Sequence, residues 1–99
     1  MNGFLYALET LIEAGAHYQN RKITLDEYKA SVYETAEALT ALEDKDLRIH
    51  LKQQENDLDS MQFTIDEDKL FEATLPLVEL IAERARKALE RWKVEKCDS

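Results

Sequence analysis

Apolar residues recur along the chain at alternating intervals of three and four, which is the spacing of one face of an α-helix. The first such run covers residues 2–18 and stops before Asn20, a residue type that tolerates the left-handed conformation of helix ends. We therefore expect a first helix over residues 2–18. Its apolar positions are Phe4, Leu5, Leu8, Leu11, Ile12, Gly15 and Tyr18.

The second predicted helix has a clear start. Thr24 to Glu27 reads T-x-x-E, the pattern of a capping box, in which two side chains accept hydrogen bonds from free backbone amides. Ile23 and Tyr28 occupy the staple positions around this box. The helix is expected to end near Leu42, before an acidic turn. Its apolar face carries Leu25, Tyr28, Val32, Ala36 and Leu39.

A third helix is predicted to begin at Asp44 or Asp46 and to end at Asp59-Ser60, followed by a connection over residues 60–64. Thr64 to Glu67 repeats the T-x-x-E pattern, which predicts that the last helix begins with a second capping box. The apolar side of the third helix consists of Leu47, Leu51 and Leu58.

The last predicted helix has the longest apolar repeat. Pro76 interrupts it, and because proline lacks an amide donor and clashes with the preceding turn, we expect a kink or a fresh helix start there. Four helices with short connections predict an all-α, antiparallel four-helix bundle. The chain is expected to form one domain over 1–99, with 94–99 as a frayed tail. The apolar repeat consists of Phe71, Leu75, Val78, Ala82, Ala85, Leu89 and Trp92.

Composition and charge narrow the possible partners. The chain has 99 residues and a net charge of −8, so nucleic acid and anionic membranes are disfavoured as ligands and a basic protein is favoured. No apolar run reaches the ~18 residues of a spanning helix. Cys97 is the only cysteine, so no internal disulfide is possible. These features predict a cytoplasmic protein that is a monomer or a weak dimer.

The negative charge is concentrated in one segment. Residues 43–68 hold nine acids and three bases, for a charge of −6, and residues 55–68 hold six acids and no Lys or Arg. Solubility alone would be served by mixed signs, so we expect these acids to form a docking surface for a basic partner. The predicted binding residues are Glu55, Asp57, Asp59, Asp66, Glu67 and Asp68.

Two other interpretations of these acids remain open. Asp57 and Asp59 could begin a calcium loop, but the loop glycine and the glutamate at its twelfth position are missing, so no metal is expected. The acids could also form a solvated face with caps, since carboxylates stabilise the first turn of a helix. That interpretation accounts in part for the presence of acids at positions 66 and 67, Asp66 and Glu67.

Motifs of catalysis are missing from the sequence, and we expect neither an enzyme nor a cofactor. His50 is the histidine with a candidate chemical role. On a four-helix bundle it could accept a phosphoryl group, but the residues after it, Leu51-Lys52-Gln53, depart from the H-x-L-K-G of histidine phosphotransfer domains. A helical signalling or scaffold module is the alternative function. Tyr6 and Tyr33 lie off the apolar stripes and are candidates for partner contact.

Two motifs resemble those of the colicin D immunity proteins, a family that also has relatives in contact-dependent growth inhibition systems. Residues 22–28, K-I-T-L-D-E-Y, are similar to K-I-T-x-x-E-aromatic. Residues 57–70, D-L-D-S-M-Q-F-T-I-D-E-D-K-L, are similar to D-x-D-x-x-x-aromatic-x-I-D-D-x-x-L without a gap. The resemblance spans about residues 8–81. Pro76 and the tail from about Arg84 depart from it.

The resemblance implies a helical inhibitor whose acidic surface fills the active site of a tRNA-cleaving toxin and imitates the RNA backbone. The binding role that it implies carries over to four positions of this sequence. Glu55 and Asp68 are added to the predicted binding residues from charge alone. The expected partner is therefore the basic nuclease domain of a cognate bacterial toxin. The four positions are Asp57, Asp59, Asp66 and Glu67.

Overall fold

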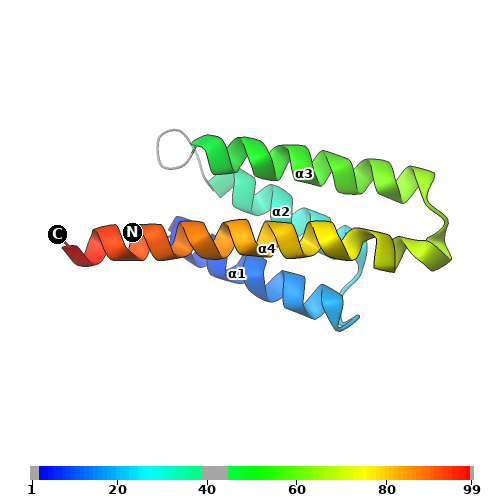
Figure 1. The fold of residues 1–99 in the computed structure, drawn as a ribbon, viewed down its shortest axis with the longest axis horizontal. Helices are drawn as coiled ribbons and strands as arrows, with labels where there is room; N and C mark the ends of the chain where they lie inside the picture. Colours follow the sequence, from blue (N-terminus) through cyan, green and yellow to red (C-terminus); the bar gives the residue numbers. More distant parts are fainter. Residues whose placement is uncertain (1–2, 39–44, 99) are drawn as a thin grey trace.

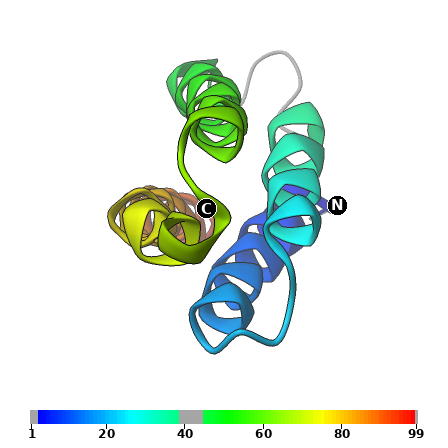
Figure 2. The same cartoon turned by 90° about the vertical axis from the view of Figure 1, so that its right-hand side faces the viewer.

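The computed structural model of the chain describes residues 3–38 and 45–98, which form four helices and no strand (Figure 1). Helix α1 spans Gly3–Gln19, α2 Leu25–Ala38, α3 Lys45–Thr64 and α4 Glu67–Asp98. Each helix packs on the next one in sequence, and α4 also packs on α1. Figure 2 shows the four helices arranged around one common axis. The predicted all-α four-helix bundle is confirmed.

The core lies along this axis and is built mainly from leucines and aromatic rings. The predicted face of α3 and the described part of the predicted α2 face are buried as expected, while Leu39 lies outside the described residues. Gln54 completes the spacing of the α3 stripe at a buried position. Burying one such leucine side chain stabilises the fold by about 1.5–3 kcal/mol. Among the residues whose side chains are described, the largest that are fully buried are Leu8, Leu11, Tyr28, Leu51, Leu58 and Ile81.

Helix α4 buries a different line of residues from the one its apolar repeat predicts. Val78 and Ala85 of that repeat are buried, while Phe71, Leu75 and Leu89 are only partly buried. Because α4 packs on both α1 and α3, its apolar arc is wider than a single stripe, and the repeat follows only one side of that arc. The buried line of α4 consists of Thr74, Val78, Ile81, Ala85 and Ala88.

Pro76 does not start a new helix, because α4 is continuous from Glu67 to Asp98. The proline is exposed, so its ring stands on the outside of the bundle.

The third helix is longer than expected, and this changes the setting of the acids. It runs to Thr64, past the predicted end at Asp59-Ser60, so Asp57 and Asp59 lie within regular helix. The predicted second capping box is wrong. The Thr64 hydroxyl donates to the Ser60 carbonyl at 2.9 Å, which is a bond within α3, and α4 begins only at Glu67. Asp66 precedes α4 at the capping position.

Helix α1 ends in a Schellman motif, one residue later than the sequence indicates. The amide of Lys22 donates to the His17 carbonyl at 2.8 Å, and the amide of Arg21 donates to Tyr18 at 2.9 Å. The left-handed residue is Arg21, with φ of 60°, where Asn20 was expected. The Arg21 guanidinium lies 3.9 Å from the centre of the Phe71 ring, a cation–π contact that offsets part of the backbone strain.

Both hydrogen bonds of the first predicted capping box are present. The Glu27 amide donates to the Thr24 hydroxyl at 3.1 Å, and the Thr24 amide donates to the Glu27 carboxylate at 2.8 Å. The staple residue Tyr28 is fully buried and Ile23 is partly buried. The start of α2 is therefore fixed by both hydrogen bonds and packing.

The two threonines provide a matched test of this difference. Thr24→Ala removes the acceptor of an otherwise unpaired amide and is expected to lower the free energy of unfolding by about 1 kcal/mol. Thr64→Ala removes only an exposed hydroxyl within α3 and is expected to change it by less than about 0.5 kcal/mol. Urea denaturation of both variants measures the difference. Equal losses would contradict the assignment of Thr24 as the cap.

Candidate protein-binding surface

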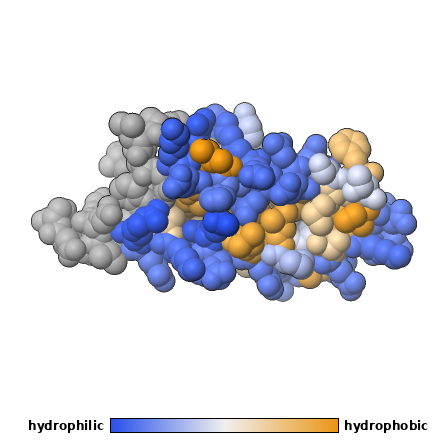
Figure 3. Space-filling model, turned by 45° about the horizontal axis from the view of Figure 1, so that its top comes forward, coloured by the Kyte–Doolittle hydropathy of each residue, from blue (hydrophilic) through white to orange (hydrophobic). Residues whose placement is uncertain are grey.

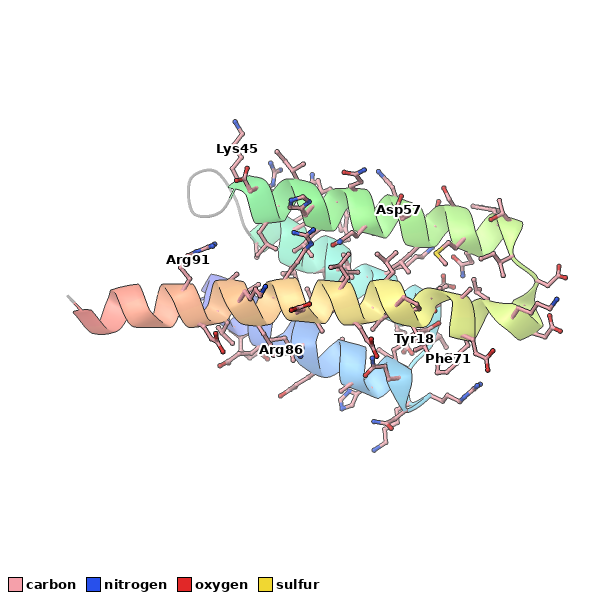
Figure 4. All side chains as sticks on the ribbon, in the orientation of Figure 1. Tyr18, Lys45, Asp57, Phe71, Arg86 and Arg91 are labelled. Carbon is pink, nitrogen blue, oxygen red and sulfur yellow. The ribbon has the colours of Figure 1, made fainter. Side chains whose placement is uncertain are left out.

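An aromatic cluster holds three helices together at one end of the bundle. The rings of Tyr18 from α1 and Tyr28 from α2 stack with 5.6 Å between centroids, and Phe71 from α4 lies 5.2 Å from Tyr18. The Tyr18 hydroxyl shares a buried hydrogen bond of 2.8 Å with Thr74. Tyr18 and Phe71 lie together beside α4 in Figure 4. This cluster fixes the end of the bundle at which α2 and α4 begin.

The two helix starts at this end carry three of the six predicted acids and two further acids. Both T-x-x-E segments of the sequence lie here, because α2 and α4 run in the same direction (Figure 1). Every carboxylate in these two segments is exposed, and those in the first helical turns are favoured by the positive ends of the helix dipoles. We call this surface the acidic end. Its carboxylates belong to Asp26, Glu27, Asp66, Glu67 and Asp68.

Phe63 adds an apolar group to the acidic end. Its side chain is 84% exposed on the last turn of α3, which makes it the most exposed of the large hydrophobic residues in the described part of the chain. The adjacent Gln62 donates to Asp26 at 3.0 Å, so this turn of α3 lies against the start of α2. An exposed aromatic ring bordered by charges is a common anchor in protein interfaces.

Asp59 is engaged within the bundle and shares its basic partner with Asp26 of the acidic end. Its carboxylate lies 2.8 Å from the Lys29 ammonium of α2, which is only 14% exposed, and the same ammonium donates to the amide oxygen of Gln62. Asp26 lies 3.8 Å from Lys29 and closes the network. Because Lys29 already compensates the charge of Asp59, this acid contributes to helix packing more than to an outward negative field.

Asp57 and Asp59 point to different sides of α3. Residues two apart on a helix are separated by about 200°, so Asp57 turns toward the α4 side while Asp59 turns toward α2. Asp57 is exposed and is labelled on α3 in Figure 4. Glu55 is half-buried and lies one turn before Asp59, on the same side of the helix. The structure therefore separates the six predicted residues into the acidic end and two sides of α3.

The sequence argument missed Asp26 and Glu27 as surface residues of the same site. Both were assigned to the capping box alone, and they lie about forty residues before the other acids in the chain. The signal was present in the similarity of the two T-x-x-E segments. Only the antiparallel packing of the helices brings these segments to one end of the molecule.

No group of three or more His, Cys, Asp or Glu that could hold a metal ion occurs among the residues described. Burial raises the pKa of the Tyr28 phenol above its ordinary value, and the neighbouring Tyr18 adds to the increase. Tyr28 is therefore a neutral packing group.

The other candidate residues lie away from the acidic end. Tyr6 and Tyr33 are exposed, as expected for possible contact residues, and Tyr6 is near the start of α1, at the opposite end of the bundle. His50 is half-buried in α3 and lines a cavity that also contains basic residues of α4. Cys97 lies outside the residues whose side chains are described.

A scan against protein-family models finds no match, and comparisons with curated proteins and with solved structures find none either. Among the described residues, no helix has the length and apolar character needed to cross a membrane. The resemblance to immunity proteins therefore rests on the two motifs. Both motifs contribute residues to the acidic end.

The Lys29–Asp59 pair is suited to a double-mutant cycle. Lys29→Met leaves Asp59 without its partner, and Asp59→Asn leaves a largely buried ammonium, so each change is expected to lower the free energy of unfolding. Because the Asp59 side chain is 50% exposed, we expect a coupling energy of only about 1 kcal/mol. Urea denaturation of the single and double variants measures it. Strictly additive effects would show that the pair does not link α2 to α3.

Proposed function

We propose that the protein is an immunity protein that binds a cognate bacterial toxin and neutralises it by covering a basic active site with the acidic end. The observation that supports this most directly is that five exposed carboxylates on two helix starts lie at the same end of the bundle as the exposed Phe63. The toxin is expected to be a tRNA-cleaving ribonuclease, as the family resemblance implies. The complex would form in the cytoplasm, where the tRNA is.

The physical basis of inhibition is competition for the same cations. A ribonuclease holds RNA phosphates with Lys and Arg side chains, and carboxylates accept hydrogen bonds from these groups in a similar geometry. Complementary fields also speed the encounter between an acidic and a basic protein. Inhibition then needs only occupation of the site, so one immunity protein blocks one toxin without turnover.

The alternative, a signalling or scaffold module, draws support from one observation. His50 lines a cavity together with Arg84 and Lys87, whose charges would stabilise a phosphoryl group on the imidazole. Incubation with acetyl phosphate distinguishes the two functions. An immunity protein is expected to remain unmodified, whereas acid-labile phosphate on His50 would support the signalling module.

The direct test of function uses the product of the neighbouring gene. An immunity gene is expected to lie beside its toxin gene, so the nuclease domain encoded there can be purified and assayed on tRNA. We expect complete inhibition at one equivalent of this protein. Full tRNA cleavage in the presence of excess protein would contradict the proposal.

Location on the molecule, not net charge, should determine binding. The triple variant D66N/E67Q/D68N removes three charges from the acidic end, and E13Q/E34Q/E90Q removes three exposed charges elsewhere. We expect the first to weaken toxin binding by at least about tenfold, since loss of one partner of a desolvated charge pair costs about 2–5 kcal/mol. The second should lower mainly the association rate. Equal affinities of the two variants, measured by surface plasmon resonance, would exclude the acidic end as the contact.

Phe63 provides a prediction that does not depend on charge. Because the ring is almost fully exposed, Phe63→Ala should leave the melting temperature nearly unchanged. If the ring anchors the complex, the same change should weaken toxin binding by about tenfold or more. Ile49→Ala, which removes an exposed side chain near the other end of α3, is the control. Similar small effects of both changes on affinity would show that Phe63 lies outside the interface.

A further inference from the structure

A cationic groove lies between α3 and α4 at the end of the bundle away from the acidic end. It encloses about 230 Å³ and is lined by the first two turns of α3 and by the second half of α4. Its α4 residues lie beyond the part of the chain covered by the family resemblance, and its α3 residues lie within that part. The lining residues are Asp46, Leu47, His50, Arg84, Lys87, Ala88 and Arg91.

The basic residues of the groove belong to one continuous stripe on α4. Leu77, Leu80, Arg84, Lys87 and Arg91 follow each other at intervals of three and four, so they share the side of the helix that faces α3. Figure 4 shows Arg91 and Arg86 on opposite sides of α4. The stripe changes from apolar to basic along its length. Leu80 is 39% exposed at the point of change.

The charge of the groove is opposite to that of the whole chain. Three bases and one acid, Asp46, line it, although the protein carries −8. The N-terminus of α3 also lies here, and its dipole adds positive potential. Lys87 has one ion pair among the described residues, with Glu83 at 3.7 Å, and both of these side chains are largely exposed. Such an exposed pair is easily exchanged for another anion.

Arg84 supplies the most specific feature of the groove. Its Nε atom is buried and has no hydrogen-bond partner in the described structure. A buried donor without a partner is costly, so a turn of the side chain that brings this atom to a ligand oxygen in the groove would be favoured. The guanidinium fork matches the two oxygens of a carboxylate or a phosphate. The groove is thus suited to an oxyanion.

The surroundings favour a carboxylate on a peptide over the phosphates of a nucleic acid. A strand of RNA continuing along the groove would pass Asp57 on α3, and it would be repelled by the net charge of the chain. A peptide can instead present one carboxylate to Arg84 and an apolar side chain to Leu80. Figure 3 shows apolar groups on this side of the molecule, most of them toward the connection of α3 and α4, and one separate apolar group among hydrophilic ones at the upper left.

We propose that the α3–α4 groove binds a protein segment through one carboxylate on Arg84 and Lys87 and one apolar side chain on Leu80. These two contact points are one helical turn apart, about 6 Å, which equals the distance between alternate residues of an extended peptide. The ligand is therefore a segment with an acidic residue two positions from a large apolar one. This proposal does not depend on the identity of the toxin.

The test uses the blocked peptide acetyl-Leu-Ala-Glu-Ala-Leu-amide, whose symmetry allows either direction of binding, and its glutamine analogue. NMR of the labelled protein follows the Nε–H group of Arg84 directly. We expect saturable binding in roughly the millimolar range, with a shift of the Arg84 signal, and about tenfold weaker binding of the glutamine peptide. Inorganic phosphate and a short RNA oligonucleotide are expected to bind more weakly than the glutamate peptide.

The control is a second arginine on the same helix. Arg84→Gln should weaken binding of the glutamate peptide by about tenfold. Arg86→Gln makes the same charge change on the opposite side of α4 and should leave the affinity for this peptide unchanged. If Arg84→Gln lowers stability, the Arg84 signal of the protein without substitutions still shows whether the glutamate peptide contacts this residue. The proposal is overturned if the two peptides bind equally, if Arg84 does not shift, or if the RNA binds more tightly than the glutamate peptide.

Discussion

The stacking of Tyr18 on Tyr28, closed by Phe71 and by the Tyr18–Thr74 hydrogen bond, is the contact on which the rest of the structure depends. It joins three helices at the end of the bundle where α2 and α4 begin. Arg21 reinforces it from outside by covering Phe71 while holding a left-handed backbone conformation at the end of α1. The positions of the acidic helix starts follow from this packing, because a shift of α2 against α4 would separate their carboxylates. A rigid, buried cluster therefore supports an exposed, charged surface.

Local sequence patterns predicted those features that are determined by neighbouring residues. The capping box at Thr24 and the leucines of α3 are where periodicity placed them, because a cap and a helix face depend on residues three or four positions apart. The same T-x-x-E pattern failed at Thr64, where the preceding helix continues through the threonine and uses its hydroxyl internally. Two segments with the same T-x-x-E pattern therefore have different hydrogen bonds, because the preceding helix continues through Thr64 but ends before Thr24. The buried line of α4 was predicted only at Val78 and Ala85, since the rest of it depends on having two neighbours.

The sequence predicted which segment supplies acids to the candidate site, but not how those acids are arranged in space. A run of acids without bases marked residues 55–68 from sequence alone. The sequence could not show that Lys29, from another helix, compensates Asp59, or that Asp26 and Glu27 join Asp66 at one surface. The cationic groove had no local signal either, because Arg84 and Lys87 are ordinary residues of a mixed-charge helix until α3 lies beside them. The acidic end and the cationic groove lie toward opposite ends of the bundle. A partner that binds one of these surfaces therefore need not contact the other.

Mapping the contact surface in the complex tests the central claim most directly. Backbone NMR spectra of the labelled protein, alone and with the nuclease domain encoded by the neighbouring gene, report which residues change environment. The account predicts the largest changes at Phe63 and at residues 66–68 and 26–27, with the Tyr18–Tyr28 cluster unchanged in packing. Changes confined to the exposed face of α1 around Tyr6, with the acidic end unaffected, would contradict it.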